Sequence, residues 1–141
     1  MKERIQDFMT RQPWTVQADD SLTIAREMLD LRRIHQLPVL DAGEITGMIS
    51  ARDLRAAGQR MGVVAELMVP AATVAMDTEL NDVLDLMSAE RYDAVVVTDA
   101  GRVEGIFTTT DALRILTSLL RRPEGRVSVH DVDREVDDVR R

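Results

Sequence analysis

Cysteine is absent from this 141-residue sequence, and lysine occurs once, at Lys2. Without cysteine, neither a disulfide framework nor a thiolate metal site can form. Because Lys2 is the sole lysine, the rest of the chain has no lysine for a phosphate-binding loop or a Schiff base. The Gly-x-Ser-x-Gly motif of many hydrolases is also missing. The sequence gives no support to catalysis, and we expect a protein that is not an enzyme.

Basic residues and long apolar runs are scarce as well. Lysine and arginine number 18 against 25 acidic residues, which gives a formal net charge of −7. Nucleic-acid affinity comes mainly from cationic side chains that meet phosphates, so we expect no nucleic-acid partner. No stretch approaches the ~18 apolar residues of a membrane span, and the N-terminus lacks the apolar run of a signal peptide. We therefore expect no membrane insertion and a cytoplasmic location.

The dominant feature that is present is an internal repeat. Residues 47–53 read Gly-Met-Ile-Ser-Ala-Arg-Asp, and residues 105–111 read Gly-Ile-Phe-Thr-Thr-Thr-Asp, at an offset of 105 − 47 = 58. In each copy an apolar, β-forming run ends at a hydroxyl residue, and an acid three positions later precedes helix-like sequence. This order predicts a strand, a turn and a helix N-terminus. We expect any ligand chemistry at these two turns.

The flanking sequence predicts the same order of elements in both halves. After an extended piece at residues 14–16, Asp20-Ser21 can cap a helix. Residues 37–40 then form a buried strand, residues 41–44 a turn and residues 45–49 the returning strand of a hairpin. The apolar stripes include Leu22, Ala25, Met28 and Leu29 in this helix and Leu54, Ala57 and Met61 in the helix after Ser50. In the second half, Thr78 caps a helix with Leu80, Val83, Leu84 and Met87 on one face, before a buried strand at residues 94–97.

These elements predict an α/β (α+β) fold of two β-α-β-β-α repeats. Repeat 1 spans residues 1–62 with a core at 9–60, and repeat 2 spans 63–120. Each repeat would bury too little surface alone, so we expect the two to pack sheet to sheet as one pseudo-twofold body. The C-terminal tail, 121–141, lies outside the repeat and is either a loosely held terminus or a segment that packs on a second subunit.

The recurring motif, hairpin and buried strand resemble a tandem pair of cystathionine β-synthase (CBS) domains, also called a Bateman module, from about Met9 to Leu120. The resemblance implies a regulatory module that holds an adenosine-containing ligand, of the AMP, ADP, ATP or S-adenosylmethionine type, in clefts between the repeats. It implies no catalytic cofactor. The implied partners are a second copy of the chain, in a homodimer, and a regulated enzyme or transporter on a separate chain.

The resemblance also implies roles for individual residues. Asp53 and Asp111 would accept hydrogen bonds from ribose hydroxyls, Ser50 and Thr108 would meet ribose or phosphate, and Arg52 could pair with phosphate. In the second copy Thr110 replaces Arg52 and the acid Asp93 replaces His35, so we expect the first site to be the better nucleotide site. A basic group from the opposite half, such as Arg33 or Arg91, would reverse this order if it reached the phosphate. The adenine slots would be lined by the backbone around Thr15, Val16, Leu37, Pro38, Thr73, Val74, Val95 and Val96.

Simpler interpretations of the same residues stay open. Ser50-x-x-Asp53 and Thr108-x-x-Asp111 also fit a helix capping box. Gly47 and Gly105 indicate either close approach to a ligand or tight packing within the sheet. His35 is best interpreted as a helix-end residue, because no His, Asp and Glu cluster with metal-ligand spacing surrounds it. The alternative function is a ligand-free structural module that serves dimerisation, for which the leucines of residues 112–120 and the segment 54–61 offer apolar surface.

Overall fold

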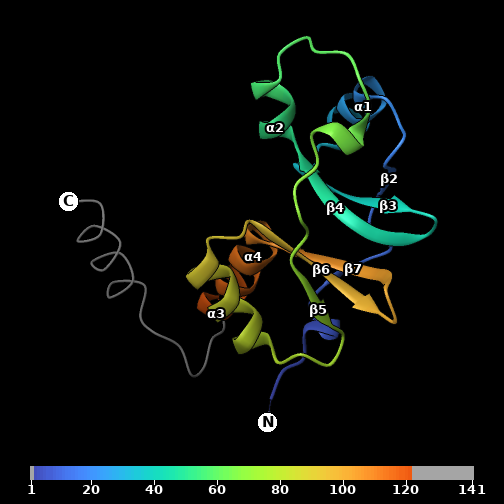
Figure 1. Ribbon diagram of the computed structural model, residues 1–141. Coiled ribbons are helices and arrows are strands. Elements are labelled where there is room, and N and C mark those ends of the chain that lie inside the picture. Colours follow the sequence, from blue (N-terminus) through green and yellow to red (C-terminus); the bar gives the residue numbers. More distant parts are fainter. Residues whose placement is uncertain (1, 122–141) are drawn as a thin grey trace. The chain divides into compact units, whose positions relative to one another are not determined.

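The computed structural model describes residues 2–121 of the chain (Figure 1). The chain divides into two compact units, residues 1–108 and 109–141, and each is described by itself. Apart from Arg121, the predicted tail lies outside the described residues.

The predicted 58-residue repeat is confirmed for the two long helices and for both hairpins. Helix α1 begins at Leu22 and α3 at Leu80, and the hairpin strands of the two halves begin and end at positions that also differ by 58. The first half contains η1 (Ile5–Asp7), β1 (Thr10–Arg11), β2 (Val16–Gln17), α1 (Leu22–Arg32), β3 (Gln36–Asp41), β4 (Glu44–Ser50) and α2 (Ala51–Ala56). The second half contains η2 (Val64–Glu66), β5 (Thr73–Ala75), α3 (Leu80–Glu90), β6 (Ala94–Asp99), β7 (Arg102–Thr108) and α4 (Thr109–Leu120).

The two long helices of residues 2–108 start in different ways. Ser21 caps α1 as predicted, because its Oγ accepts a hydrogen bond from the Ile24 N–H at 3.1 Å. The predicted Thr78 cap of α3 is wrong: the N-cap is Glu79, without a side-chain cap bond. The first N–H of α3, on Leu80, donates to the backbone carbonyl of Glu3 at 2.8 Å, and the equivalent N–H of α1, on Leu22, donates to that of Gly62 at 3.0 Å. The two helices therefore share this long-range backbone bond and differ in the side-chain cap alone.

Both predicted hairpins are confirmed, and their turns explain their sharp reversal. Ala42 and Gly43 have φ of 52° and 82°, and Ala100 and Gly101 have φ of 52° and 81°. Positive φ at both central residues is the conformation of the type I′ turn, whose twist matches that of paired strands. Each turn therefore sets the register of one hairpin.

The N-terminal segment of each half crosses to the sheet of the other half. One sheet has the order β2-β3-β4, and the second has the order β1-β7-β6-β5, so β1 of the first half pairs with β7 of the second. The second half does the same in the opposite direction: Val69, which precedes β5, forms an antiparallel β-bridge with Met48 of β4. This exchange has no signal in the sequence, because β1 has two residues and no alternating pattern.

The exchange explains the two motif glycines. A Cβ on Gly47 would lie 2.9 Å from the carbonyl oxygen of Val69, and one on Gly105 would lie 2.9 Å from that of Thr10. Both distances are too short for a Cβ contact, so the crossing segment requires glycine at these positions. Of the two interpretations of these glycines, the structure supports tight packing within the sheet.

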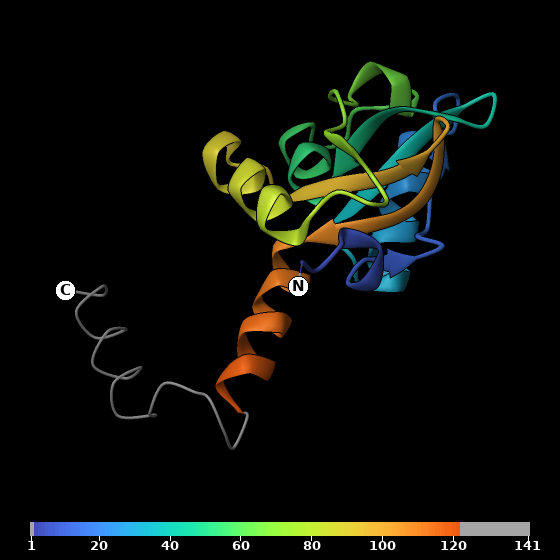
Figure 2. The same ribbon diagram turned by 90° about the horizontal axis from the view of Figure 1, so that it is seen from below.

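The predicted packing of sheet against sheet is confirmed within residues 2–108. A cluster of Met48, Val96 and Ile106 joins the two sheets, and β4 lies against β7 (Figure 2, teal and orange ribbons). A second cluster, formed by Val16, Leu22, Ala25, Leu29, Leu37, Val39, Ile49, Leu54 and Val64, fills the space between the first sheet and its helices. Since Val64 belongs to the second half, the repeats also share this core.

The helix after Ser50 is shorter than predicted. Helix α2 ends at Ala56, and Gly58 adopts φ of 64°. This left-handed conformation is incompatible with a continuing right-handed helix. Leu54 is buried as predicted, but Met61 lies beyond the helix and is 80% exposed. The prediction that Met61 points towards the core is therefore wrong.

Candidate functional site

The turn between β4 and α2 forms a complete capping box. Ser50 Oγ accepts a hydrogen bond from the Asp53 N–H at 3.0 Å, and an Asp53 carboxylate oxygen accepts one from the Ser50 N–H at 3.2 Å. The N–H of Ala51 donates to the carbonyl of His35 at 2.9 Å. The capping interpretation of Ser50-x-x-Asp53 is thus confirmed for this turn. Both side chains are half-buried, so they also border solvent.

An ion pair connects this turn to the second half. The guanidinium of Arg52 lies 3.7 Å from a carboxylate oxygen of Asp93, and the two side chains are 81% and 53% exposed. Asp93 directly precedes β6, the buried strand of repeat 2. The Ser50–Asp53 turn therefore faces the beginning of a strand from the other repeat. We call Ser50, Arg52, Asp53, Asp93 and the backbone at the start of β6 the Asp53 site.

The start of each buried strand extends beyond its parallel neighbour. The ladder between β2 and β3 joins Val16–Gln17 to Val39–Leu40, and that between β5 and β6 joins Thr73–Ala75 to Val96–Thr98. The first residues of β3 and β6 precede these ladders. A strand segment that projects past its neighbour offers backbone groups at an edge, where a planar ligand can add hydrogen bonds.

The apolar residues that the resemblance implies as ligand-lining are core residues. The side chains of Val16, Leu37, Pro38, Val95 and Val96 are buried. Thr15 and Val74 are half-buried, and Thr73 is exposed. The buried residues can therefore meet a ligand only through their backbone, which is the contact that the sequence analysis expects.

The second motif is divided between the two units of the chain. Thr108 ends β7, opposite Ala94 in the register of the hairpin. Asp111 lies in the first turn of α4, is 9% exposed and has a carboxylate oxygen 3.4 Å from the Arg114 guanidinium. Within α4 this contact spans three residues, a spacing that places the two side chains on one face.

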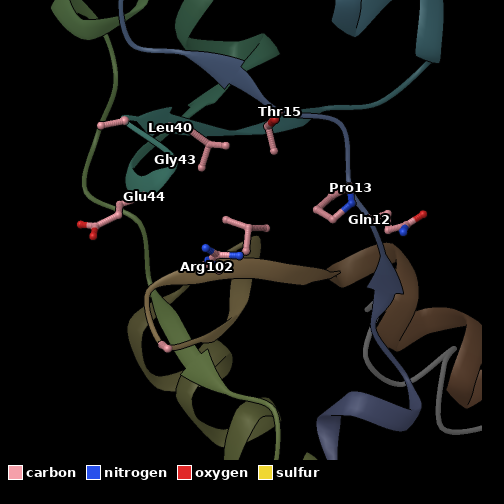
Figure 3. Close-up of a pocket in the computed structure, with 10 residues that line it drawn as sticks. Gln12, Pro13, Thr15, Leu40, Gly43, Glu44 and Arg102 are labelled. Atoms are coloured by element: carbon pink, nitrogen blue, oxygen red, sulfur yellow. The ribbon is translucent and has the colours of Figure 1, made fainter.

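A separate open pocket of about 500 Å³ lies at the hairpin turns (Figure 3). Its lining comprises Gln12, Pro13, Thr15, Leu40, Ala42, Gly43, Glu44, Ala100, Arg102 and Val103. Glu44 begins β4 and Ser50 ends it, so this pocket is at the opposite end of the strand from the Asp53 site. Thr15 is the residue that the pocket shares with the predicted ligand positions.

Two features of residues 2–108 were missed in the sequence analysis. One is the pairing of Arg52 with Asp93, although Asp93 occupies the repeat position of His35, since 93 − 35 = 58. The other is the Arg32 guanidinium, which stacks on the Trp14 ring at 3.8 Å from its centroid. Neither contact has a sequence signal, because each joins residues from different elements.

Among residues 2–121, no helix has the length and apolar content that crossing a membrane requires.

Comparison with known proteins identifies the family. The family described as "CBS domain" matches residues 5–60 and 64–118. A zinc metalloprotease of Methanocaldococcus jannaschii is 29% identical over 124 residues, which cover 86% of this chain; the match spans 34% of that relative, so the chain corresponds to about a third of its length.

Solved structures of CBS pairs have the same fold. The CBS domain pair of protein MJ0100, in complex with 5′-methylthioadenosine and S-adenosyl-L-methionine, has a TM-score of 0.78 and 27% identity and covers 84% of this chain and 98% of its own. The protein CBSX2, in complex with AMP, has a TM-score of 0.76 and 28% identity and covers 84% and 99%. The two domain matches, the repeat and this shared fold lead to one conclusion: the chain belongs to the CBS domain family and contains two CBS domains in tandem.

Proposed function

We propose that this chain is a regulatory module that binds an adenosine-containing ligand between its two repeats and transmits occupancy to a partner protein. Two similar CBS pairs have been solved with adenosine compounds, one with 5′-methylthioadenosine and S-adenosyl-L-methionine and one with AMP. The structural similarity to each of these two pairs covers 84% of this chain. A cytoplasmic location and a regulated enzyme or transporter on a separate chain remain predictions, as does the absence of catalysis.

The observation that best supports this function is the construction of the Asp53 site from both repeats. The Ser50–Asp53 turn belongs to repeat 1, while Asp93 and the start of β6 belong to repeat 2. A ligand between them contacts both halves at once, so its binding favours one arrangement of the halves over others. This is the physical requirement for a module that senses a ligand.

Within this site the proposed roles follow from chemistry. The Asp53 carboxylate is an acceptor that suits a pair of ribose hydroxyls, and it exchanges its bond to the Ser50 N–H for bonds to the ligand. The backbone around Thr73, Val74, Val95 and Val96 lines the adenine slot. Ligand-binding roles for Thr108 and Asp111, and for the backbone around Thr15, Val16, Leu37 and Pro38, remain predictions.

We also propose that the module is a homodimer formed through α4. Leu113, Leu116 and Leu119 are 61%, 51% and 46% exposed, and their spacing of three residues places them on one face of the helix. An apolar helix face of this kind is typical of a protein–protein contact. The competing function is a dimerisation module that binds no ligand.

Mass spectrometry of small molecules released on denaturation tests the proposed function. Purified protein is denatured after extensive washing, and the supernatant is compared with that from the Asp53→Ala variant. We expect an adenosine compound in amounts near stoichiometric with wild-type protein, or, if the sites are purified empty, a rise in melting temperature on adding AMP, 5′-methylthioadenosine or S-adenosylmethionine. Absence of any release and of any thermal shift would favour the ligand-free dimerisation module.

A further inference from the structure

The Asp53 site contains several groups that could bind phosphate, and the structure shows that most of them are already engaged. The N–H groups of Ala51 and Asp53 donate to the His35 carbonyl and to Ser50 Oγ, while the Ser50 N–H donates to the Asp53 carboxylate until that carboxylate turns to the ligand. Phosphate binding at a helix start depends on such N–H groups being available, together with the dipole of a helix. Helix α2 has six residues, so its dipole is small. This turn is therefore poorly equipped to hold a phosphate.

The cation of the site is engaged as well. Arg52, which the sequence analysis assigns to phosphate, lies 3.7 Å from the Asp93 carboxylate. A phosphate that recruits Arg52 must compete with this carboxylate, and it must also lie close to a negative charge. The charged groups that define the site are Arg52, Asp53 and Asp93, whose formal charges sum to −1. The electrostatics of the site thus oppose an anionic ligand.

Asp93 is peculiar to the second repeat. The equivalent residue of repeat 1 is His35, whose side chain carries no negative charge. The scaffold at the two positions is the same, because β3 begins at Gln36 and β6 at Ala94. A single side chain therefore gives the start of β6 a negative charge that the start of β3 lacks.

We infer that Asp93 is a specificity-determining residue, and that the Asp53 site takes an adenosyl ligand whose 5′ substituent is neutral or cationic, in preference to a 5′-phosphate. This inference rests on the proposed function, and it reverses the expectation that Arg52 makes the first site the better nucleotide site. A thioether or a sulfonium with an amino-acid tail meets these conditions. Asp93 attracts the cationic group and keeps Arg52 away from phosphate.

The test is calorimetric titration of AMP, 5′-methylthioadenosine and S-adenosylmethionine into wild type, Asp93→Asn and Asp85→Asn. Asp85 is an exposed residue of α3, so its variant is a control with the same change in net charge. Backbone amide shifts of Ser50 and Ala94 report which ligands occupy this site. Asp93→His, which installs the residue of repeat 1, is a second specificity variant.

We expect wild type to bind S-adenosylmethionine or 5′-methylthioadenosine more tightly than AMP at this site. Asp93→Asn should bind AMP about three- to tenfold more tightly, the size of one screened charge interaction with a phosphate dianion, and the gain should shrink at high salt. Asp85→Asn should match wild type. Wild-type preference for AMP at this site, or equal AMP affinities in Asp93→Asn and Asp85→Asn, would overturn the inference alone. If none of the three compounds binds, the proposed function fails and the inference fails with it.

Discussion

The two repeats have nearly the same backbone but different chemistry at equivalent positions. Both hairpins, both long helices and both crossing segments recur at fixed offsets. The side chains at the motif turns do not, because Arg52 corresponds to Thr110 and His35 to Asp93. Helix α2 has six residues and α4 has twelve. The comparison shows that a duplicated scaffold preserves the backbone of both repeats while the side chains at the motif turns and the lengths of the helices that follow them diverge.

The largest predicted effect concerns the difference between α2 and α4. Replacing Leu116 with Glu puts a charge in the proposed dimer contact, and we expect the dimer dissociation constant to rise by at least about 100-fold, or ~2.7 kcal/mol. Sedimentation velocity over a range of concentrations measures this. The control is Leu31→Glu, because Leu31 is a 78% exposed leucine of α1. A wild-type monomer at micromolar concentration, or equal effects of both variants, would contradict dimerisation through α4.

The crossing segments should be equally intolerant of a side chain in both repeats. Gly47→Ala and Gly105→Ala each place a Cβ against a backbone carbonyl that pairing holds in position. We expect each to lower the free energy of unfolding by about 1–3 kcal/mol, as for other overpacked sites, in urea denaturation. The side chain of Met9 also contacts a Cβ at residue 105, so Met9→Ala and Gly105→Ala should show coupling in a double-mutant cycle. Additive losses would argue against the close approach.

The helix caps should differ between repeats. Ser21→Ala removes a side-chain cap bond of α1, and we expect a loss of about 1 kcal/mol in the free energy of unfolding. Glu79→Ala removes no cap bond but breaks an exposed ion pair with Lys2 at 3.5 Å, so its effect should stay below about 0.5 kcal/mol. Thermal denaturation of both variants measures the contrast, and equal losses would mean that Glu79 stabilises α3 in another way.

The smallest effect should come from the Trp14–Arg32 contact, which repeat 2 lacks because Ala72 and Glu90 stand at the equivalent positions. Both side chains border solvent, so Arg32→Gln should cost about 0.5–1 kcal/mol of stability and change Trp14 fluorescence. Glu90→Gln is the matched control on α3. An unchanged emission spectrum in Arg32→Gln would contradict the stacking of Arg32 on Trp14.

Local patterns predicted most of the elements but not the contacts between them. The hairpins followed from Ala-Gly turns between apolar runs, and the α1 cap followed from Ser21 before a helical stripe. The Thr78 cap was wrong because α3 begins at the same repeat position as α1, so its N-cap is Glu79, the counterpart of Ser21, and Thr78 lies one residue too early. The prediction that Met61 points towards the core was wrong because the predicted helix continued beyond Gly58, whereas α2 ends at Ala56. The Arg52–Asp93 pair joins two repeats, and a single sequence contains no record of that proximity.

The central claim is that Asp53 binds the ligand in addition to capping α2, and one calorimetric comparison tests it. S-adenosylmethionine is titrated into wild type, Asp53→Ala and Ser21→Ala, the last being a variant that loses a helix cap outside the site. We predict that Asp53→Ala loses about 1.5–3 kcal/mol of binding free energy, roughly a ten- to 150-fold rise in Kd, while Ser21→Ala binds as wild type does. Equal affinities of Asp53→Ala and Ser21→Ala would contradict it and leave Asp53 with the capping role alone.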